Sequence, residues 1–125
     1  LMPHRSVFLT LIVACFALTC AGGAAEARRV ALVIGNSAYA DVPALPNPGN
    51  DAQDARDAFV KAGFEVELVR DGDLAAMRRG LDAFVKKVLT AGPAATALVF
   101  YAGHAVQFDG ANYLLPVDVR ARRRL

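Results

Sequence analysis

Tryptophan is absent from this 125-residue chain, and its only cysteines, Cys15 and Cys20, both lie near the amino terminus. Without a framework of spaced cysteines the chain is not a disulfide-rich miniprotein, and without a glycine period it is not collagenous. Charged residues make up only 21% of the sequence and hydrophobic residues 55%, which excludes a disordered polar tract. The length is that of one compact domain.

Basic charge is in excess only at the carboxyl-terminal end of the chain. The net charge is +2, but Arg120 and the run 122–124 carry the excess, and the rest of the chain after residue 27 is mildly acidic. Binding of nucleic acid requires a basic stripe on a folded face. We therefore expect no nucleic-acid partner.

Several ligand-binding motifs are also missing. Gly35 and Asn36 are not followed by the further glycines of a dinucleotide fingerprint, and no phosphate-binding loop of the type G-x-x-x-x-G-K-[ST] occurs. His104 is the single histidine after the first 27 residues, and one histidine among scattered carboxylates is weak support for a metal site. We therefore assign no metal ligands.

The first 27 residues have the pattern of a secretory signal peptide. His4 and Arg5 precede an uncharged run, 6–25, and residues 25–27, Ala-Glu-Ala, offer a small-x-small cleavage site. We therefore expect an exported protein, periplasmic or secreted, whose mature part contains no cysteine. The alternative is a membrane anchor, because residues 6–25 are just long enough to span a bilayer.

Strand and helix patterns alternate in the remaining chain. The continuous apolar run 30–34 predicts a strand buried on both faces, and the run 96–101 predicts another buried strand. Residues 64–69 alternate in polarity, which predicts a strand with one wet face near a sheet edge. Residues 112–116 can add a short extended piece. Strands separated by helical segments imply an α/β fold with a parallel sheet.

Two helices are expected between these strands. The first begins at Asn50, whose side chain can cap the free amides of the first turn together with Gln53, and it ends at Gly63. Asp73 can cap the second helix, in which apolar residues recur every three or four positions until Gly92 interrupts the pattern. We expect the charged residues of both helices to face solvent.

Polar residues cluster where the expected strands end, which is where parallel sheets form functional sites. Asn36 and Ser37 follow the first strand, and Asp71 follows the second. His104 follows the third strand, and Asp51 at the start of the first helix can join the same rim. His104 can act as a general base or acid near neutral pH, and the alternative is a hydrogen-bonded surface histidine.

A histidine base needs a nucleophile to activate. The mature chain offers no cysteine, and its only serine, Ser37, is expected to cap or turn the loop in which it lies. The residues alone therefore lead to an exported α/β domain with a candidate histidine site. An unrelated α/β enzyme with a different cofactor remains an alternative.

Four segments of the chain together match the pattern of one family. They are RVALVIGNSAY at 29–39, LPNPGNDA at 45–52, FYAGHA at 100–105 and YLLPVD at 113–118. In this order they resemble the bacterial caspase-like cysteine peptidases of the metacaspase and orthocaspase group, peptidase family C14. The resemblance covers residues 28–118. It implies an α/β caspase-like three-layer sandwich, with a mainly parallel sheet and flanking helices, truncated to the amino-terminal, p20-like part.

The resemblance also implies roles for individual residues. His104 matches the catalytic histidine, which exchanges protons with a cysteine. Ala105 stands where the family has a glycine whose backbone N–H binds the oxyanion. Asp51 aligns with an acid that binds a basic substrate side chain, although it can equally be a first-turn acid that stabilises the helix. Asp118 is either a loop acid or a calcium ligand of the kind found in some complete family members, and no other cofactor is implied.

The chain departs from the family in its nucleophile. In caspases the histidine precedes the cysteine by about 50 residues, and no cysteine follows His104 in this sequence. We expect a truncated domain that cannot cleave peptides alone, followed by an Arg-rich tail, 119–125. In the complete protein the partner would be a peptide or protein substrate.

Two further expectations follow from this truncation. The first is an alternative function, a non-catalytic pseudopeptidase or a binding or regulatory fragment. The second concerns association, because a missing neighbour beside the strand 96–101 would leave an apolar sheet edge. We expect aggregation or dimerisation through that edge.

Overall fold

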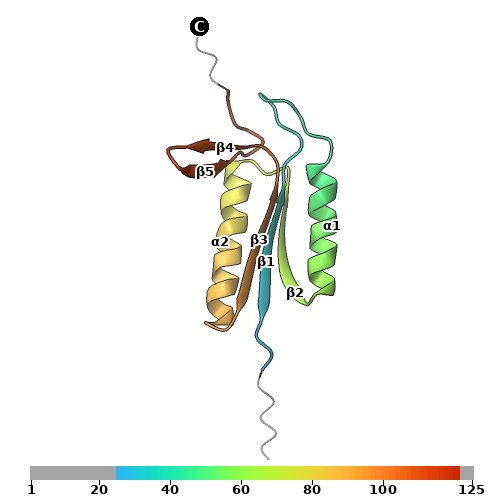
Figure 1. Ribbon diagram of the computed structural model, residues 1–125, viewed down its shortest axis with the longest axis vertical. Helices are drawn as coiled ribbons and strands as arrows, with labels where there is room; N and C mark the ends of the chain where they lie inside the picture. The colour runs from blue at the N-terminus through green and yellow to red at the C-terminus, as the bar shows by residue number, and fades with distance from the viewer. Residues whose placement is uncertain (1–24, 122–125) are drawn as a thin grey trace, which may run out of the picture.

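The computed structural model describes residues 25–121 of the chain. Helices and strands alternate and then give way to a small hairpin (Figure 1). In chain order the elements are β1 Arg29–Gly35, α1 Pro48–Lys61, β2 Phe64–Arg70, α2 Leu74–Ala91, β3 Thr96–Ala102, β4 Ala105–Phe108 and β5 Ala111–Leu114.

The first three strands form a parallel sheet in the order β2-β1-β3. Helix α1 lies on one side of this sheet and α2 on the other, which gives three layers (Figure 1). The three strands begin at the same height in the sheet, because Arg29, the first residue of β1, pairs with Phe64 of β2 and with Thr96 of β3. The α/β class with a mainly parallel sheet and flanking helices, expected from the sequence, is confirmed.

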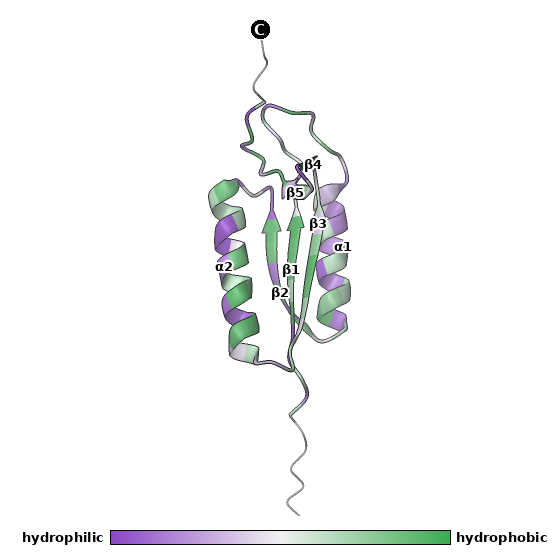
Figure 2. Ribbon diagram, turned by 60° about the vertical axis from the view of Figure 1, so that its left-hand side comes forward, coloured by the Kyte–Doolittle hydropathy of each residue, from purple (hydrophilic) through white to green (hydrophobic). Residues whose placement is uncertain are grey.

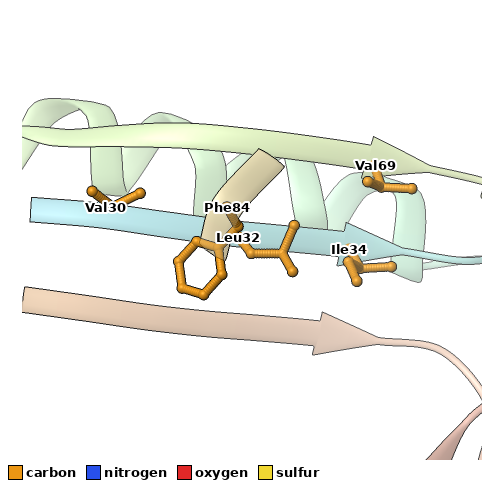
Figure 3. Close-up of a cluster of buried hydrophobic side chains, with 5 residues drawn as sticks. All are labelled: Val30, Leu32, Ile34, Val69 and Phe84. Atoms are coloured by element: carbon orange, nitrogen blue, oxygen red, sulfur yellow. The ribbon is translucent and has the colours of Figure 1, made fainter. Parts of the chain in front are cut away.

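Strand β1 is the centre of the core because it has a strand on each side and a helix on each face. Val30, Ala31 and Val33 have no exposed surface, and Leu32 is 1% exposed. Side chains at alternate positions of β1 face α2, where they meet Phe84 and a residue of β2 (Figure 3). This cluster consists of Val30, Leu32, Ile34, Val69 and Phe84. Burying each such side chain stabilises the fold by about 1.5–3 kcal/mol.

The two helices show less continuous hydrophobicity than the strands. In Figure 2 the strands are mainly hydrophobic, whereas polar and apolar residues alternate along both helices. In α1 the fully buried Ala52 faces the sheet, and Phe59 contacts the rings of Phe64 and Phe100 on the same side. This is the amphipathic pattern expected for helices that cover a buried sheet.

The start of α1 differs from the expectation. The helix begins at Pro48, not after a cap at Asn50, and the residue at the N-cap position, Asn47, makes no side-chain cap. Proline suits the first helical turn because it has no N–H to satisfy there. The N–H of Gly49 donates to Ser37 Oγ, 3.0 Å away, so a distant loop supplies the missing cap. Gln53 does not form a capping box.

The other helix boundaries are as predicted. Asp73 Oδ1 accepts a hydrogen bond from Ala76 N at 2.7 Å, which caps α2. Gly63 follows α1 with φ of 82°, and Gly92 follows α2 with φ of 88°. Glycine enters this left-handed region at little cost, so both residues stop their helices.

Strand β3 is less buried than the sequence suggested. Thr96 and Ala97 are exposed, and Val99 keeps 54% of its surface accessible, so the expectation of a third fully buried strand was wrong. The reason is its position at the edge of the sheet, with β1 on one side only. The opposite edge strand, β2, was correctly expected to lie near an edge.

Of the hairpin that follows β3, the sequence predicted only the second strand. The extended piece expected at 112–116 corresponds to β5, which pairs antiparallel with β4. Asp109 and Gly110 form the turn with φ of 48° and 76°. Positive φ at both central residues is the geometry that Asp-Gly favours in tight hairpins.

Most of the expected signal peptide, 1–27, and the end of the Arg-rich tail, 119–125, lie outside the described residues. Residues 25–27 are exposed and lead into β1. Between residues 25 and 121, no helix is both long and apolar enough to span a bilayer.

Candidate active site

The carboxyl ends of β1, β2 and β3 lie side by side. Gly35 pairs with Arg70 and with Ala102, so the residues that follow each strand emerge at one rim. These include Asn36 after β1, and His104 after β3. The structure therefore brings the predicted polar residues to the same end of the sheet, where parallel sheets place their sites.

The imidazole of His104 lies at this rim and contacts the loop between β1 and α1. Its Nε2 is 2.8 Å from the carbonyl oxygen of Pro43. The ring packs against Tyr39, with ring centroids 4.7 Å apart and the planes tilted by 56°. Because a carbonyl oxygen can only accept a hydrogen bond, Nε2 must carry the proton in this contact. In the neutral ring Nδ1 then has a free lone pair and can accept a proton.

The main chain of His104 is held by two tyrosines. Its N–H donates to the Tyr39 hydroxyl at 2.8 Å, and its carbonyl oxygen accepts from the Tyr101 hydroxyl at 2.6 Å and from Leu115 N at 3.0 Å. Burial, followed by the adjacent Tyr39 hydroxyl, raises the pKa of Tyr101 well above its ordinary value of 10.0. Tyr101 therefore remains a proton donor throughout the physiological pH range.

The backbone N–H of Ala105 is directed away from the hairpin ladder. Ala105 pairs with Leu114 in the antiparallel ladder, and the hydrogen bond from Leu115 N to His104 O flanks this pair. That pattern makes Ala105–Leu114 a non-hydrogen-bonded pair, whose N–H groups do not point at the partner strand. Ala105 is not among the residues with positive φ, so alanine in place of glycine causes no backbone strain here.

Asn36 has a structural role at the rim. Its side chain is fully buried, so it is not available to a substrate. Its Oδ1 accepts from Gly72 N at 2.9 Å, and its Nδ2 donates to Leu115 O at 3.1 Å. Its backbone N donates to Ala102 O at 2.9 Å. Asn36 thus ties the end of β1 to β3, to the start of α2 and to the segment after β5.

Ser37 and Asp71 fix the loop that follows β1. Asp71 Oδ1 accepts from the backbone N–H groups of Ser37 and Ala38, at 2.8 and 2.9 Å. Ser37 Oγ accepts from Gly49 N, as described for the start of α1. The structure places Ser37 as a loop and helix cap, as the sequence analysis expected, and these bonds hold the loop that carries Pro43.

The two candidate carboxylates, Asp51 and Asp118, lie on different elements. Asp51 is exposed in the first turn of α1, where a negative charge stabilises the helix. Asp118 Oδ1 accepts from Leu74 N at 3.0 Å and so contributes a second cap to α2. Within residues 25–121 no three potential metal-ligating side chains gather at one place.

Sequence reasoning missed four contributors to the site: Pro43, Tyr39, Tyr101 and Leu115. Tyr39 and Tyr101 lie inside the segments 29–39 and 100–105 that carried the resemblance, but nothing local indicated that their hydroxyls meet. Pro43 acts through its backbone carbonyl and Leu115 through its backbone N–H and carbonyl, and such groups leave no signal in a sequence.

Besides a hollow of about 470 Å³ between β2 and α2, two surface hollows lie away from His104. One, of about 290 Å³, is at the opposite end of the sheet, beside Arg28, Gly63 and Glu65. The other, of about 220 Å³, lies between α2 and β3 and is almost entirely apolar. Its lining residues are Leu32, Ile34, Leu74, Met77, Arg78, Leu81, Val99 and Leu114.

Comparison with known proteins identifies the family of the chain. Residues 28–124 match the family model of the C14 peptidases, described as the caspase domain. The chain is also similar to a human protein, mucosa-associated lymphoid tissue lymphoma translocation protein 1, with 31% identity over 90 residues. That match covers 72% of this chain but spans only 11% of the length of the human protein.

Proposed function

Because this chain belongs to the caspase-domain family, we propose that it carries the histidine half of the active site of a cysteine endopeptidase. The observation that supports this most strongly is the 2.8 Å contact between His104 Nε2 and Pro43 O. It leaves Nδ1 as the basic nitrogen of a ring that lies at the rim of the sheet. A general base must present a free lone pair to the proton that it removes.

The proposed reaction uses His104 twice. Nδ1 takes the proton of a cysteine thiol, and the resulting thiolate attacks the carbonyl carbon of the scissile peptide bond. The imidazolium then returns the proton to the leaving amine, and water hydrolyses the thioester. The sulfur must come from outside residues 21–125, because that part of the chain has no cysteine. We therefore propose that this chain alone does not cleave peptides.

Ala105 is proposed as the backbone donor to the oxyanion. Its N–H lies next to His104 in sequence and is not directed at β5, as the pairing pattern indicates. Preorganised N–H donors stabilise the charge that develops on the carbonyl oxygen during acyl transfer. An alanine serves as well as a glycine here because only the backbone group acts.

Asp51 is proposed to bind a basic substrate side chain. Its carboxylate is exposed and can form charge-assisted hydrogen bonds with arginine or lysine. The competing role, stabilisation of the α1 N-terminus, is worth about 0.3–1 kcal/mol. Asp51→Asn separates the two roles, because loss of substrate preference without loss of stability supports binding.

We also propose, from the sequence pattern, that the chain belongs to the bacterial metacaspase group and is exported through residues 1–27. Detection of the mature protein in periplasmic or culture fractions, with a new amino terminus near Arg28, tests export. Retention of residues 6–25 in the membrane fraction would instead support the anchored alternative.

The peptidase proposal is tested first by sequencing the DNA downstream of the last codon of this chain. A downstream Asp-x-Cys segment supports a catalytic domain, whereas its absence favours the second candidate function, a non-catalytic pseudopeptidase or regulatory module. The extended protein should cleave fluorogenic peptides that end in arginine or lysine. His104→Ala should abolish this cleavage, and the matched variant His4→Ala should retain it. Histidine-dependent cleavage by the present chain alone would refute its proposed inactivity.

Self-association through β3 is proposed as a separate property, with a second copy of this chain as the partner. Strand β3 has the sequence Thr-Ala-Leu-Val-Phe-Tyr-Ala, without a charge or proline, and one edge of it is unpaired within the described sheet. The opposite edge strand, β2, carries Glu65, Glu67 and Arg70, which oppose pairing. The hollow beside β3 continues this surface onto α2, where all its lining residues except Arg78 are apolar. Pairing of two β3 strands about a twofold axis would bury the same apolar groups from both copies.

A further inference from the structure

The two tyrosine hydroxyls beside His104 form a chain of hydrogen bonds with both ends on the same residue. The His104 N–H donates to Tyr39 Oη at 2.8 Å, and Tyr101 Oη donates to the His104 carbonyl oxygen at 2.6 Å. The two hydroxyl oxygens are 3.2 Å apart. Two side chains, one from the loop after β1 and one from β3, therefore bind the backbone N–H and the backbone carbonyl of a single residue.

The number of protons on each group assigns the direction of the two bonds to His104. Each phenol has one proton to donate. The Tyr101 proton goes to His104 O, because that contact, at 2.6 Å, is shorter than the 3.1 Å contact with Leu115 O. Tyr39 accepts from His104 N, so its own proton is free for Tyr101 Oη or for Leu115 O, each 3.2 Å away. Donation to Tyr101 Oη closes a ring in which each hydroxyl donates and accepts and strengthens its neighbours, and donation to Leu115 O leaves both bonds to His104 in place.

Gly103 gives independent support for this ring. Its φ is +155°, and a Cβ added there would lie 2.6 Å from both tyrosine hydroxyl oxygens. The hydroxyls thus occupy the space that the absent side chain leaves, immediately before His104. Substitution of Gly103 cannot be accommodated without displacing the two phenols.

We propose that Tyr39 and Tyr101 are positioning residues, which fix the main chain of His104 and thereby hold its ring against Pro43 O in the Nε2–H tautomer. Tyr39 contributes a second restraint because its ring packs on the imidazole, with centroids 4.7 Å apart. The importance of this tautomer for catalysis rests on the proposed function. The restraint itself is a property of the chain as it stands and can be measured without any peptidase activity.

The test is nuclear magnetic resonance of the full chain labelled with ¹⁵N and ¹³C. In the wild type, the imidazole of His104 should show a protonated Nε2 and an unprotonated Nδ1. Loss of these signals in His104→Gln distinguishes them from those of His4. Tyr39→Phe and Tyr101→Phe remove only a hydroxyl, and each should shift both nitrogen signals towards the average of the two tautomers. Tyr113→Phe, an exposed tyrosine on β5, should leave them unchanged.

A second readout uses amide exchange. The His104 amide should exchange slowly in the wild type and about threefold to tenfold faster in Tyr39→Phe, which loses its acceptor. This measurement on the wild type needs no variant, so the proposal stays testable even if a variant does not fold. An unprotected His104 amide in the wild type would overturn the proposed restraint by Tyr39.

The outcomes separate positioning from simple stabilisation. If both phenylalanine variants unfold at lower denaturant concentration but keep the wild-type tautomer signals, the tyrosines are structural and the proposal is wrong. If the tautomer shifts as expected but the extended protein shows no peptidase activity, the positioning is upheld and the proposed function fails. A shift in Tyr113→Phe as large as in the other two variants would also overturn the assignment.

Discussion

His104 and Pro43 are joined by a 2.8 Å contact between an imidazole nitrogen and a backbone carbonyl oxygen, across 61 positions of the sequence. The contact places the loop after β1 against the residue that follows β3. Its direction is set by chemistry, since the carbonyl oxygen has no proton to give. The orientation of the candidate base is therefore set by a backbone carbonyl group, which residues other than proline would also offer at position 43.

Asn36→Ala should lower the free energy of unfolding by about 2–3 kcal/mol, because it leaves the buried N–H of Gly72 without an acceptor and removes a donor to Leu115 O. Urea unfolding of the full chain measures the change. Asn112→Ala, in the exposed β5, is the control and should stay within about 0.5 kcal/mol of the wild type. A loss below about 1 kcal/mol in Asn36→Ala would contradict the structural role given to this side chain.

Gly103→Ala should destabilise the chain more than Gly110→Ala. Both glycines have positive φ, so alanine is strained at either site, by about 1–2 kcal/mol at Gly110 with φ of 76° and by more at Gly103 with φ of 155°. At Gly110 nothing lies within 4 Å of an added Cβ, whereas at Gly103 the two tyrosine hydroxyls are 2.6 Å away. The difference in unfolding free energy between the two variants measures the crowding at Gly103 together with the greater backbone strain there. Equal losses would show that the phenols move aside freely.

Lys87 should stabilise the fold by roughly 0.5 kcal/mol at neutral pH, through ion pairs with Glu65 and Glu67 at 3.2 and 3.1 Å. Its hydrogen bonds, first with Glu67 and then with Glu65, raise the pKa of Lys87. Hydrogen bonds from Lys87 and then Arg28 lower the pKa of Glu65. The stabilisation should therefore be lost as pH falls through the lowered pKa of Glu65, below its ordinary 4.5, or rises through the raised pKa of Lys87, above its ordinary 10.5.

Lys87→Met tests this expectation, because methionine keeps the aliphatic packing and removes the charge. The stability difference from the wild type should be constant between about pH 5 and 10 and shrink outside that window. High salt should also shrink it. The exposed neighbour Lys86, which forms none of the ion pairs found in residues 25–121, provides the control Lys86→Met. A pH-independent difference would rule out the ion pairs as its source.

Val99→Lys should weaken self-association of the full chain. Val99 is 54% exposed on the edge strand β3, and a lysine there opposes pairing with a second copy. Sedimentation velocity should show concentration-dependent association of the wild type and a dimer Kd raised about tenfold or more in the variant. Val60→Lys on α1, where valine is 48% exposed, should associate like the wild type. A wild type that stays monomeric at all concentrations would overturn the proposed pairing.

The sequence predicted the elements whose signals are local. The apolar run of β1 indicated a doubly buried strand because its burial requires nothing more than continuous hydrophobicity, and the fully buried Val30 and Val33 confirm it. Asp73 was correctly predicted as a cap because its acceptor lies three residues from the donor, Ala76 N. The start of α1 was mispredicted because its cap, Ser37 Oγ, comes from a loop twelve positions away.

By itself, the sequence determined the α/β class, the parallel order of strands and helices, and the place of His104 beyond the end of a strand. Local periodicity and chain connectivity suffice for these, because they depend on neighbouring residues. Only the tertiary structure decided that Pro43 O contacts the imidazole of His104 and that Tyr39 and Tyr101 form hydrogen bonds with the main chain of that residue. It also decided that β3 lies at an edge of the sheet. These features join residues far apart in sequence through backbone groups and hydroxyls, whose partners are fixed only when the strands come into register.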